Sequence, residues 1–299
     1  MKRTQLNLVL LVLVAGLGAA AYFGQKKEEK GTPLTALTAD TLTQIALEHP
    51  GRPKILLKKS GSQWQLLEPV QADTDPFEVS ALVGLATVEA KRRIPVAEVK
   101  LPELGLQPAA YRVRLNDTVL DMGEIEPIEA RRYVLAGNEV ALIDDPPSAA
   151  LDADYSDLVS KALVPDTAEI VKIELKEFQV VRSADGKAWS MLPLLPAAAT
   201  TAPQQLAEAW KGARAMWMAA ELPEGSSGDP VRLTLKDGRV IELLVAERDP
   251  QLVLARPDLK LRYTLSKALE PELLTLSAAR AQPKQPSVDV PAQTGSPAY

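Results

Sequence analysis

Apolar and polar positions follow the same succession twice along the chain, in residues 43–151 and again in 171–276. The two stretches are offset by about 125 residues, which is the signature of an internal repeat. Each opens with an alternating segment, 45–48 or 173–176, of the kind that forms a half-buried strand. The pattern therefore predicts one structural unit written twice.

Both copies continue with a second strand, a small turn and a strand that begins with tryptophan. Trp64 opens this third strand in the first copy and Trp189 opens it in the second. The turns contain glycine and polar residues, which favour tight reversals of the chain. The second strands are predicted at 55–57 and 180–181, the turns at 60–62 and 184–186, and the third strands at 64–69 and 189–193.

A helix is predicted after the third strand of each copy. In the first copy Asp75 suits the N-cap, Pro76 the first helical position, and Glu78 the position three after the cap. In the second copy Pro203 marks the start of the helix. The apolar faces predicted from helical spacing are Val79, Leu82, Val83 and Ala86 in the first copy, and Leu206, Trp210, Ala213 and Trp217 in the second.

Further strands follow each helix, and short helices at 146–151 and 268–276 close the two copies. Residues 132–135 and 262–265, each starting Arg-Tyr, are interpreted as a matching pair. Consecutive strands joined by short turns favour antiparallel pairing. The predicted strands are 111–115, 118–122, 132–135 and 140–143, then 231–235, 240–245, 252–255 and 261–265.

Residues 8–23 form an apolar run without charge at the N-terminus. As a helix it would reach about 25 Å, close to the roughly 30 Å of a bilayer core. Its position suggests an export signal that stays in the membrane as an anchor. The alternative is cleavage at the small residues 19–21, which would leave a soluble exported protein.

These patterns predict an α+β fold with an N-terminal transmembrane helix and two similar repeats of antiparallel sheet plus helix. The tail is poor in apolar residues, so we expect it to be disordered. The predicted segments are an anchor at 1–24, a linker at 25–40, the first repeat at 41–151, a connector at 152–170, the second repeat at 171–276 and the tail at 277–299.

Composition narrows the possible functions. The 299 residues are 46% hydrophobic and 24% charged, which is an ordinary globular balance. A net charge of −5 with scattered lysine and arginine argues against a nucleic-acid partner. The absence of cysteine from the sequence excludes disulfides, a lipid-bearing cysteine and thiol chemistry.

The order of Trp64, a helix, Gly105-Leu106, Tyr111-Arg112-Val113, Gly123 and Arg132-Tyr133-Val134, behind a leading apolar run, resembles a bacterial envelope family. That family is known as domain of unknown function 4340, and the resemblance covers nearly the whole chain. It implies an envelope protein that is often associated with ABC-type export systems of the gliding-motility kind. It implies no active-site residues.

His49 is the sole histidine of the sequence, so a multi-histidine metal site is excluded and a serine triad would need His49 as its base. It precedes Pro50 and Gly51, which favours a solvated turn over a catalytic role.

Two acidic clusters are candidate sites. Asp152, Asp154 and Asp157 could ligate calcium, but the spacing lacks the glycine and final glutamate of an EF-hand loop, which favours a solvated linker. The second cluster could supply paired carboxylates for glycoside cleavage, although an ion-paired hairpin loop is favoured. It consists of Glu124, Glu126 and Glu129 next to Arg131 and Arg132.

The tryptophans at positions 64, 189, 210 and 217 could form a platform for a sugar or a peptide, but their placement favours core packing. Gly16 and Gly18 lie inside the apolar run, so they do not form a dinucleotide loop. At most, small residues there could provide a helix contact face, comprising Ala15, Gly16, Ala19 and Ala20.

The sequence thus predicts no catalytic, cofactor or metal site and no enzyme. It favours an accessory or scaffold protein at the inner membrane with its bulk in the periplasm, whose partners are membrane proteins such as an ABC-type transporter. The alternatives are a glycan- or peptide-binding module with a groove between the repeats, and a carboxylate hydrolase. Oligomeric state and partner identity stay open.

Overall fold

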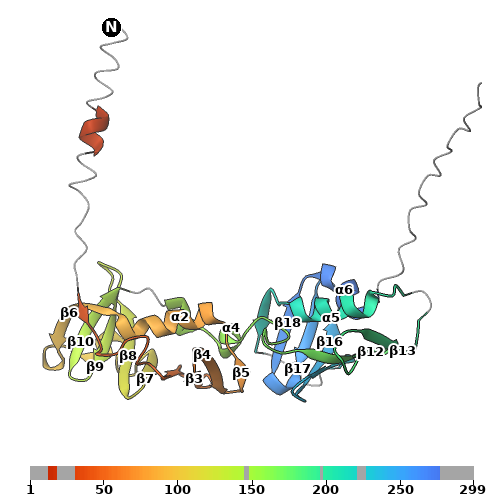
Figure 1. Ribbon diagram of the computed structural model, residues 1–299. Helices are drawn as coiled ribbons and strands as arrows, with labels where there is room; N and C mark the ends of the chain where they lie inside the picture. The colour runs from red at the N-terminus through yellow and green to blue at the C-terminus, as the bar shows by residue number, and fades with distance from the viewer. Residues whose placement is uncertain (1–12, 19–30, 145–147, 196–197, 221–226, 277–299) are drawn as a thin grey trace, which may run out of the picture. The chain divides into compact units, whose positions relative to one another are not determined.

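The computed structural model describes residues 13–18, 31–144, 148–195, 198–220 and 227–276. The chain divides into two compact units, Met1–Ala153 and Asp154–Tyr299. Each unit is built around one antiparallel sheet, and each sheet pairs strands of its own unit alone among the described residues (Figure 1).

The first unit contains a ten-stranded sheet in the order β1-β6-β10-β9-β8-β7-β2-β3-β4-β5. Its strands are β1 (Thr32–Pro33), β2 (Gln44–Glu48), β3 (Ile55–Ser60), β4 (Gln63–Glu68), β5 (Ala72–Asp73), β6 (Glu89–Pro95), β7 (Tyr111–Leu115), β8 (Thr118–Ile125), β9 (Arg131–Ala136) and β10 (Glu139–Asp144).

The second unit contains an eight-stranded sheet in the order β13-β12-β11-β15-β16-β17-β18-β14. Its strands are β11 (Ile170–Glu174), β12 (Gln179–Arg182), β13 (Trp189–Leu192), β14 (Trp217–Ala219), β15 (Asp229–Leu235), β16 (Val240–Glu247), β17 (Leu252–Arg256) and β18 (Leu261–Leu265).

The two sheets have the same topology once the two-residue strands β1 and β5 are set aside. Read from the far end, β6-β10-β9-β8-β7-β2-β3-β4 corresponds strand for strand to β14-β18-β17-β16-β15-β11-β12-β13. The structural repeat expected from the sequence is therefore present. Its registers also agree, because Glu48 pairs with Arg112 as Glu174 pairs with Arg232.

Helix α2 (Pro76–Gly84) begins where the sequence predicts. The Asp75 side chain accepts a hydrogen bond from the Phe77 amide, and Pro76 occupies the first turn, where a missing N–H costs nothing. Val79 and Leu82 are buried beneath the helix. Helix α3 (Ser148–Asp152) contacts α2 in the same unit.

Helix α5 (Ala202–Gly212) occupies the corresponding place in the second unit and contacts α6 (Glu270–Leu274). Leu206 and Trp210 face inward, and the Trp210 indole donates a 2.9 Å hydrogen bond to the Leu273 carbonyl. The remaining helical segments are α4 (Tyr155–Leu158) and the 3-10 turns Leu85–Thr87, Val96–Glu98, Leu101–Leu104, Pro257–Leu259 and Lys267–Leu269.

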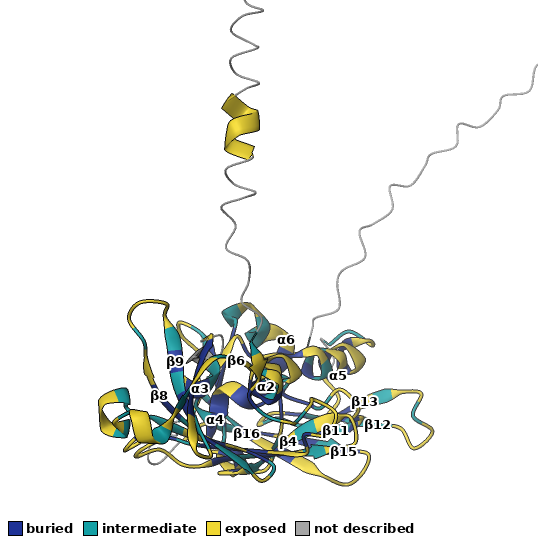
Figure 2. Ribbon diagram, turned by 90° about the vertical axis from the view of Figure 1, so that its left-hand side faces the viewer, coloured by how far each residue is buried: buried dark blue, intermediate teal, exposed yellow. Residues whose placement is uncertain are grey.

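Alternation along the strands places one apolar row of each sheet in a core (Figure 2). In the first unit Ile45 and Leu47 are fully buried, and in the second Leu233 is fully buried and Leu243 nearly so. The predicted turns recur as well. Gly61 and Gly186 lie at φ +63° and +73°, which is a left-handed conformation that glycine adopts freely.

The predicted α+β class with an N-terminal transmembrane helix is wrong. The described residues form two mainly antiparallel sheets, and the principal helices are only nine and eleven residues long. None of the described helices has the length and apolar character needed to span a bilayer. Residues 13–18 of the apolar run form a short helix. The other positions of the run, including the predicted cleavage site at 19–21, lie outside the described residues.

Besides the two-residue strands β1 and β5, the strands β6 and β14 were not predicted, and one pairing of repeats was assigned to the wrong strand. The strands β6 and β14 lie between helix and hairpins in each unit. Helix α5 ends at Gly212, so Trp217 belongs to β14 and not to the predicted helical stripe. Arg132 lies on β9, whose counterpart is β17, whereas Arg262 lies on β18.

Predicted linkers take part in the fold. Within the predicted connector 152–170, Leu158 and Leu163 are buried in the second unit, and α4 forms there. Part of the predicted linker 25–40 is β1, which pairs with β6. The predicted tail at 277–299 lies outside the described residues.

Candidate functional site

His49 is buried, which contradicts the predicted solvated turn. It follows the last residue of β2, is 9% exposed, and directs Nε2 at the carbonyl oxygen of Leu151. Since a carbonyl only accepts, Nε2 is the donor in this contact. Within the described part of the chain, Nδ1 has no hydrogen-bond partner.

His49 belongs to a polar cluster around Tyr111. The two rings meet edge to face at 5.4 Å, and the Arg132 guanidinium lies 5.7 Å from the Tyr111 ring centre. The Tyr111 hydroxyl donates to Asp152, and this hydrogen bond raises the pKa of Tyr111, with burial adding to the effect. Arg52 donates to the Asp152 carbonyl at 3.1 Å. The cluster thus fixes the end of α3 against the first sheet.

The acidic clusters do not form the weighed calcium or glycosidase sites. Asp154 and Asp157 form the capping box of α4, so they belong to a helix start and not to a linker, although Asp157 is exposed as predicted. Glu129 pairs with Arg131 at 2.7 Å, and Glu126 accepts from the Glu129 amide, which is the predicted ion-paired loop. No cluster suited to a metal occurs among the residues that the structure describes.

The tryptophans separate into three environments. Trp210 is fully buried, as predicted for a core residue. Trp217 is 49% exposed, which the predicted core role did not anticipate. Trp64 and Trp189 are half-buried near the starts of equivalent strands, as the second residue of β4 and the first of β13, and they pair with Lys59 and Arg182 respectively.

An acid–arginine–acid ladder crosses three strands at the same register in both units. Arg112 binds Asp121 through Nε at 2.6 Å and pairs across the other strand with Glu48. Arg232 repeats the arrangement between Glu174 and Glu242. Because both copies carry it on an exposed face, the ladder is a general feature of the sheet, and each pair contributes little stability.

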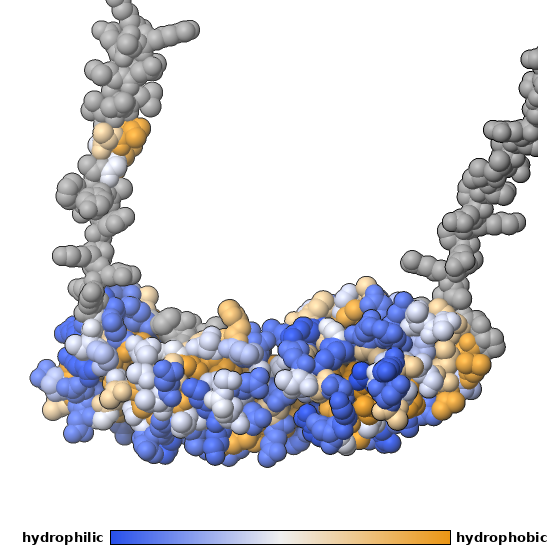
Figure 3. All heavy atoms as spheres, in the orientation of Figure 1, coloured by the Kyte–Doolittle hydropathy of each residue, from blue (hydrophilic) through white to orange (hydrophobic). Residues whose placement is uncertain are grey.

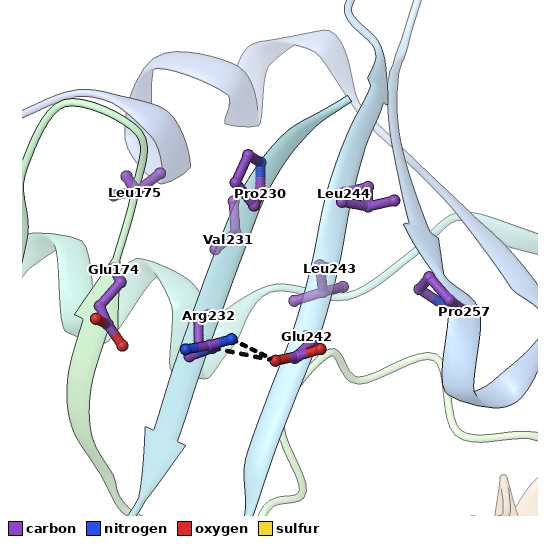
Figure 4. Close-up of a pocket in the computed structure, with 9 residues that line it drawn as sticks. All are labelled: Glu174, Leu175, Pro230, Val231, Arg232, Glu242, Leu243, Leu244 and Pro257. Carbon is purple, nitrogen blue, oxygen red and sulfur yellow. Dashed lines mark hydrogen bonds and ion pairs between the residues drawn. The ribbon is translucent and has the colours of Figure 1, made fainter. Parts of the chain in front are cut away.

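A shallow groove of about 500 Å³ lies beside this ladder in the second unit (Figure 4). Leu175, Pro230, Leu244 and Pro257 supply apolar surface, and Arg232 and Glu242 form a 2.7 Å ion pair across it. In the first unit a hollow of about 370 Å³ lies at the corresponding position and includes His49. These hollows follow from the repeat and do not single out a reactive centre.

The second unit has a further groove, the Trp189 groove, of about 470 Å³ between helix α5 and the start of β11. Buried Ala168, Ile170 and Ala207 form its floor. Trp189 lines one wall. The α5 wall consists of residues at helical spacing, namely Gln204, Ala207, Glu208 and Lys211.

Three charged side chains that line the Trp189 groove are engaged by other groups of the chain. Glu169 accepts from Lys236 at 3.1 Å and from Arg182 at 3.0 Å, and these bonds lower the pKa of Glu169. Lys211 donates to three backbone carbonyls, those of Pro165, Asp166 and Ala168. Lys187 and Glu208 also line the groove, and neither has an ion-pair partner among the described residues.

An exposed apolar segment follows Trp189 along the chain. We call residues 192–195 the leucine segment, since it contains Leu192, Leu194 and Leu195, which are 53%, 78% and 37% exposed. Figure 3 shows apolar surface at the end of the second unit that carries β13. Three neighbouring exposed leucines cost solvation free energy unless a partner covers them.

Comparison with known proteins gives one family match. The family model described as "Domain of unknown function (DUF4340)" matches residues 64–215, about half of the chain. No curated protein and no solved structure matches. The matched region extends from β4 to the end of α5, and it includes the Trp189 wall and the leucine segment.

Proposed function

Because the chain belongs to the DUF4340 family, whose description names no activity, we propose that it is a non-catalytic accessory or scaffold protein that acts by binding a protein partner. The observation that carries the proposal is the leucine segment. Leucines exposed side by side on a folded unit are typical of a surface that is covered in a complex.

The side-chain chemistry supports a binding role over a catalytic one. Of the carboxylates considered for hydrolysis, Glu129 forms an ion pair with Arg131 and Glu126 accepts from the Glu129 amide. A hydrolase of that type needs two acids facing one cleft with separated pKa values. Glu126 and Glu129 instead serve the local structure of one loop.

For location and partner we propose the inner membrane, with the bulk of the chain in the periplasm, and an ABC-type transporter as the complex it joins. The family resemblance supports this assignment. The apolar character of residues 8–23 also supports the proposed location, because such a run is typical of an export signal.

The test is affinity recovery of the full-length protein from its native membrane in mild detergent, with partners quantified by mass spectrometry. A triple variant, Leu192→Ser, Leu194→Ser and Leu195→Ser, removes the apolar surface. We expect partner recovery to fall about tenfold or more, because exposed leucines that become buried contribute about 1.5–3 kcal/mol each.

Ile128→Ser is the matched control, since Ile128 is 88% exposed on the first unit. This variant should recover partners as the wild type does. Wild-type protein that elutes without any stoichiometric partner would argue against the accessory role. Equal recovery by the triple variant would exclude the leucine segment as the contact surface.

A further inference from the structure

We propose that the Trp189 groove binds an uncharged saccharide, with one pyranose ring resting on the Trp189 indole and its hydroxyls bonded to side chains of α5. This assignment adds a ligand to the second unit and does not depend on the protein partner proposed above. It rests on the shape of the groove, on the hydrogen-bonding groups left free in it, and on the contacts that already hold Arg182 and Lys211.

The size and floor of the groove suit a small ligand that has an apolar face. A volume of about 470 Å³ falls within the range of small-molecule sites and has room for one or two sugar rings. Trp189 is half-buried, so its ring is held by the sheet while part of it stays accessible. An indole offers a flat apolar surface with a polar N–H at its edge.

The α5 wall supplies groups that match hydroxyls. Gln204 and Glu208 are both exposed, and the Gln204 amide donates to Glu208 at 2.8 Å. That bond leaves the Gln204 carbonyl oxygen and the second Glu208 oxygen without a partner among the described residues. Hydroxyl groups donate and accept, so a sugar can satisfy both oxygens.

The contacts of the charged side chains argue against other ligand classes. Lys211 donates to backbone carbonyls and Arg182 donates to Gly186 and Glu169, so these two cations are held by the protein, and the Glu208 carboxylate on the α5 wall would repel a phosphate. A purely aliphatic ligand would bury the Gln204 and Glu208 oxygens without hydrogen bonds, which costs about 1–3 kcal/mol for each group.

The first unit provides an internal contrast. Trp64 lies on β4, the strand equivalent to the β13 of Trp189, but its cross-strand neighbour is Lys59, which donates to the Ala39 carbonyl at 3.1 Å. The cation beside Trp64 therefore reaches toward a different segment from the one that Arg182 reaches. The two tryptophans lie on equivalent strands and differ in surroundings, which makes Trp64 a suitable control.

The experiment uses the full-length protein with ¹⁵N-labelled tryptophan and follows the four indole N–H signals in NMR spectra, assigned by single Trp→Phe variants. The probes are cellotriose and triacetylchitotriose, and a neutral tripeptide serves as the competing class. We expect saccharide to shift the Trp189 signal saturably while the signals of Trp64 and Trp217 stay in place.

Calorimetry on two variants then separates binding from folding. Trp189→Ala should weaken saccharide binding about tenfold or more, and Glu208→Gln should weaken it about three- to tenfold while leaving the indole spectrum of the free protein unchanged. Trp64→Ala should bind as the wild type does. Absence of saturation by both saccharides up to about 10 mM, or a response to the tripeptide alone, would overturn the assignment.

Discussion

At the scale of single residues, the two repeats differ most in the polarity of two equivalent positions. His49 and Tyr111 in the first unit correspond to Leu175 and Val231 in the second, since the strand registers agree. The same sheet is therefore built once with a polar cluster and once with aliphatic side chains. The fold itself does not require the polar cluster, so its role is particular to the first unit.

That role is to hold the end of α3, and removal of one hydroxyl tests it. Tyr111→Phe deletes the donor to Asp152 and leaves the ring in place against His49. We expect a loss of about 1 kcal/mol in the free energy of unfolding of the first unit, measured by urea denaturation, because a hydrogen bond to a charged acceptor is lost at a partly exposed site.

Tyr133→Phe is the matched control, since the Tyr133 hydroxyl has no hydrogen-bond partner among the described residues. It should change stability by less than about 0.5 kcal/mol.

The dependence of stability on alkaline pH gives a second readout. The pKa of Tyr111 is raised in the folded protein, so the Tyr111 hydroxyl stabilises the fold fully at pH values below its unfolded pKa. This stabilisation is lost as the pH rises through the folded pKa. Wild type and Tyr111→Phe should therefore converge in stability at alkaline pH.

The sequence could not reveal this cluster. Pro50 and Gly51 after His49 are turn residues, which made exposure the natural prediction. The acceptor of His49 is the carbonyl of Leu151, which lies 102 positions away in the chain. Contacts of that range depend on the packing of α3, and no local pattern encodes them.

At the scale of elements, prediction succeeded where local chemistry is decisive. Alternation identified β2 and β11, and Asp75 with Pro76 located the start of α2. Strand β6 was missed because its residues are mostly charged and exposed, which hides a two-residue period. Strand β14 was missed because Trp217 continues the helical spacing of Trp210, and propensity does not mark where α5 ends.

Trp210 and Trp217 lie in different environments, so substituting each of them tests how α5 is held. Trp210 is fully buried and bonded to the Leu273 carbonyl of α6. Trp210→Ala should destabilise the second unit by about 3–5 kcal/mol in urea denaturation, because a large core cavity and an unpaired carbonyl result.

Trp217→Ala changes the same residue type on β14, where the side chain is 49% exposed. It should cost less than about 1 kcal/mol, since most of the lost surface already faces water. Equal losses from the two substitutions would contradict the end of α5 at Gly212 and would favour the uninterrupted helical stripe that the sequence suggested.

At the scale of the whole molecule, the duplication is the feature that sequence and structure share most fully. The alternation of apolar residues makes the duplication visible in the sequence, because each copy must bury one face of an equivalent sheet. The sequence pattern does not mark the boundary between the two units, which lies inside the predicted connector 152–170. Asp154 begins the second unit, and the capping box it forms with Asp157 starts α4 within three residues of the last helix of the first unit.

A division at Ala153 and Asp154 predicts that each unit folds by itself. Each described strand pairs within its own unit, and each sheet has a separate set of fully buried side chains. Separate fragments 31–153 and 154–276 should each unfold cooperatively in urea and give well-dispersed NMR spectra, since domains of such length bury enough apolar surface to be stable.

A fragment 171–276, cut where the sequence placed the second repeat, lacks buried Leu158 and Leu163. It should be less stable than 154–276 by several kcal/mol, because two core leucines are lost. Equal stability of the two fragments would return residues 154–170 to the role of a connector.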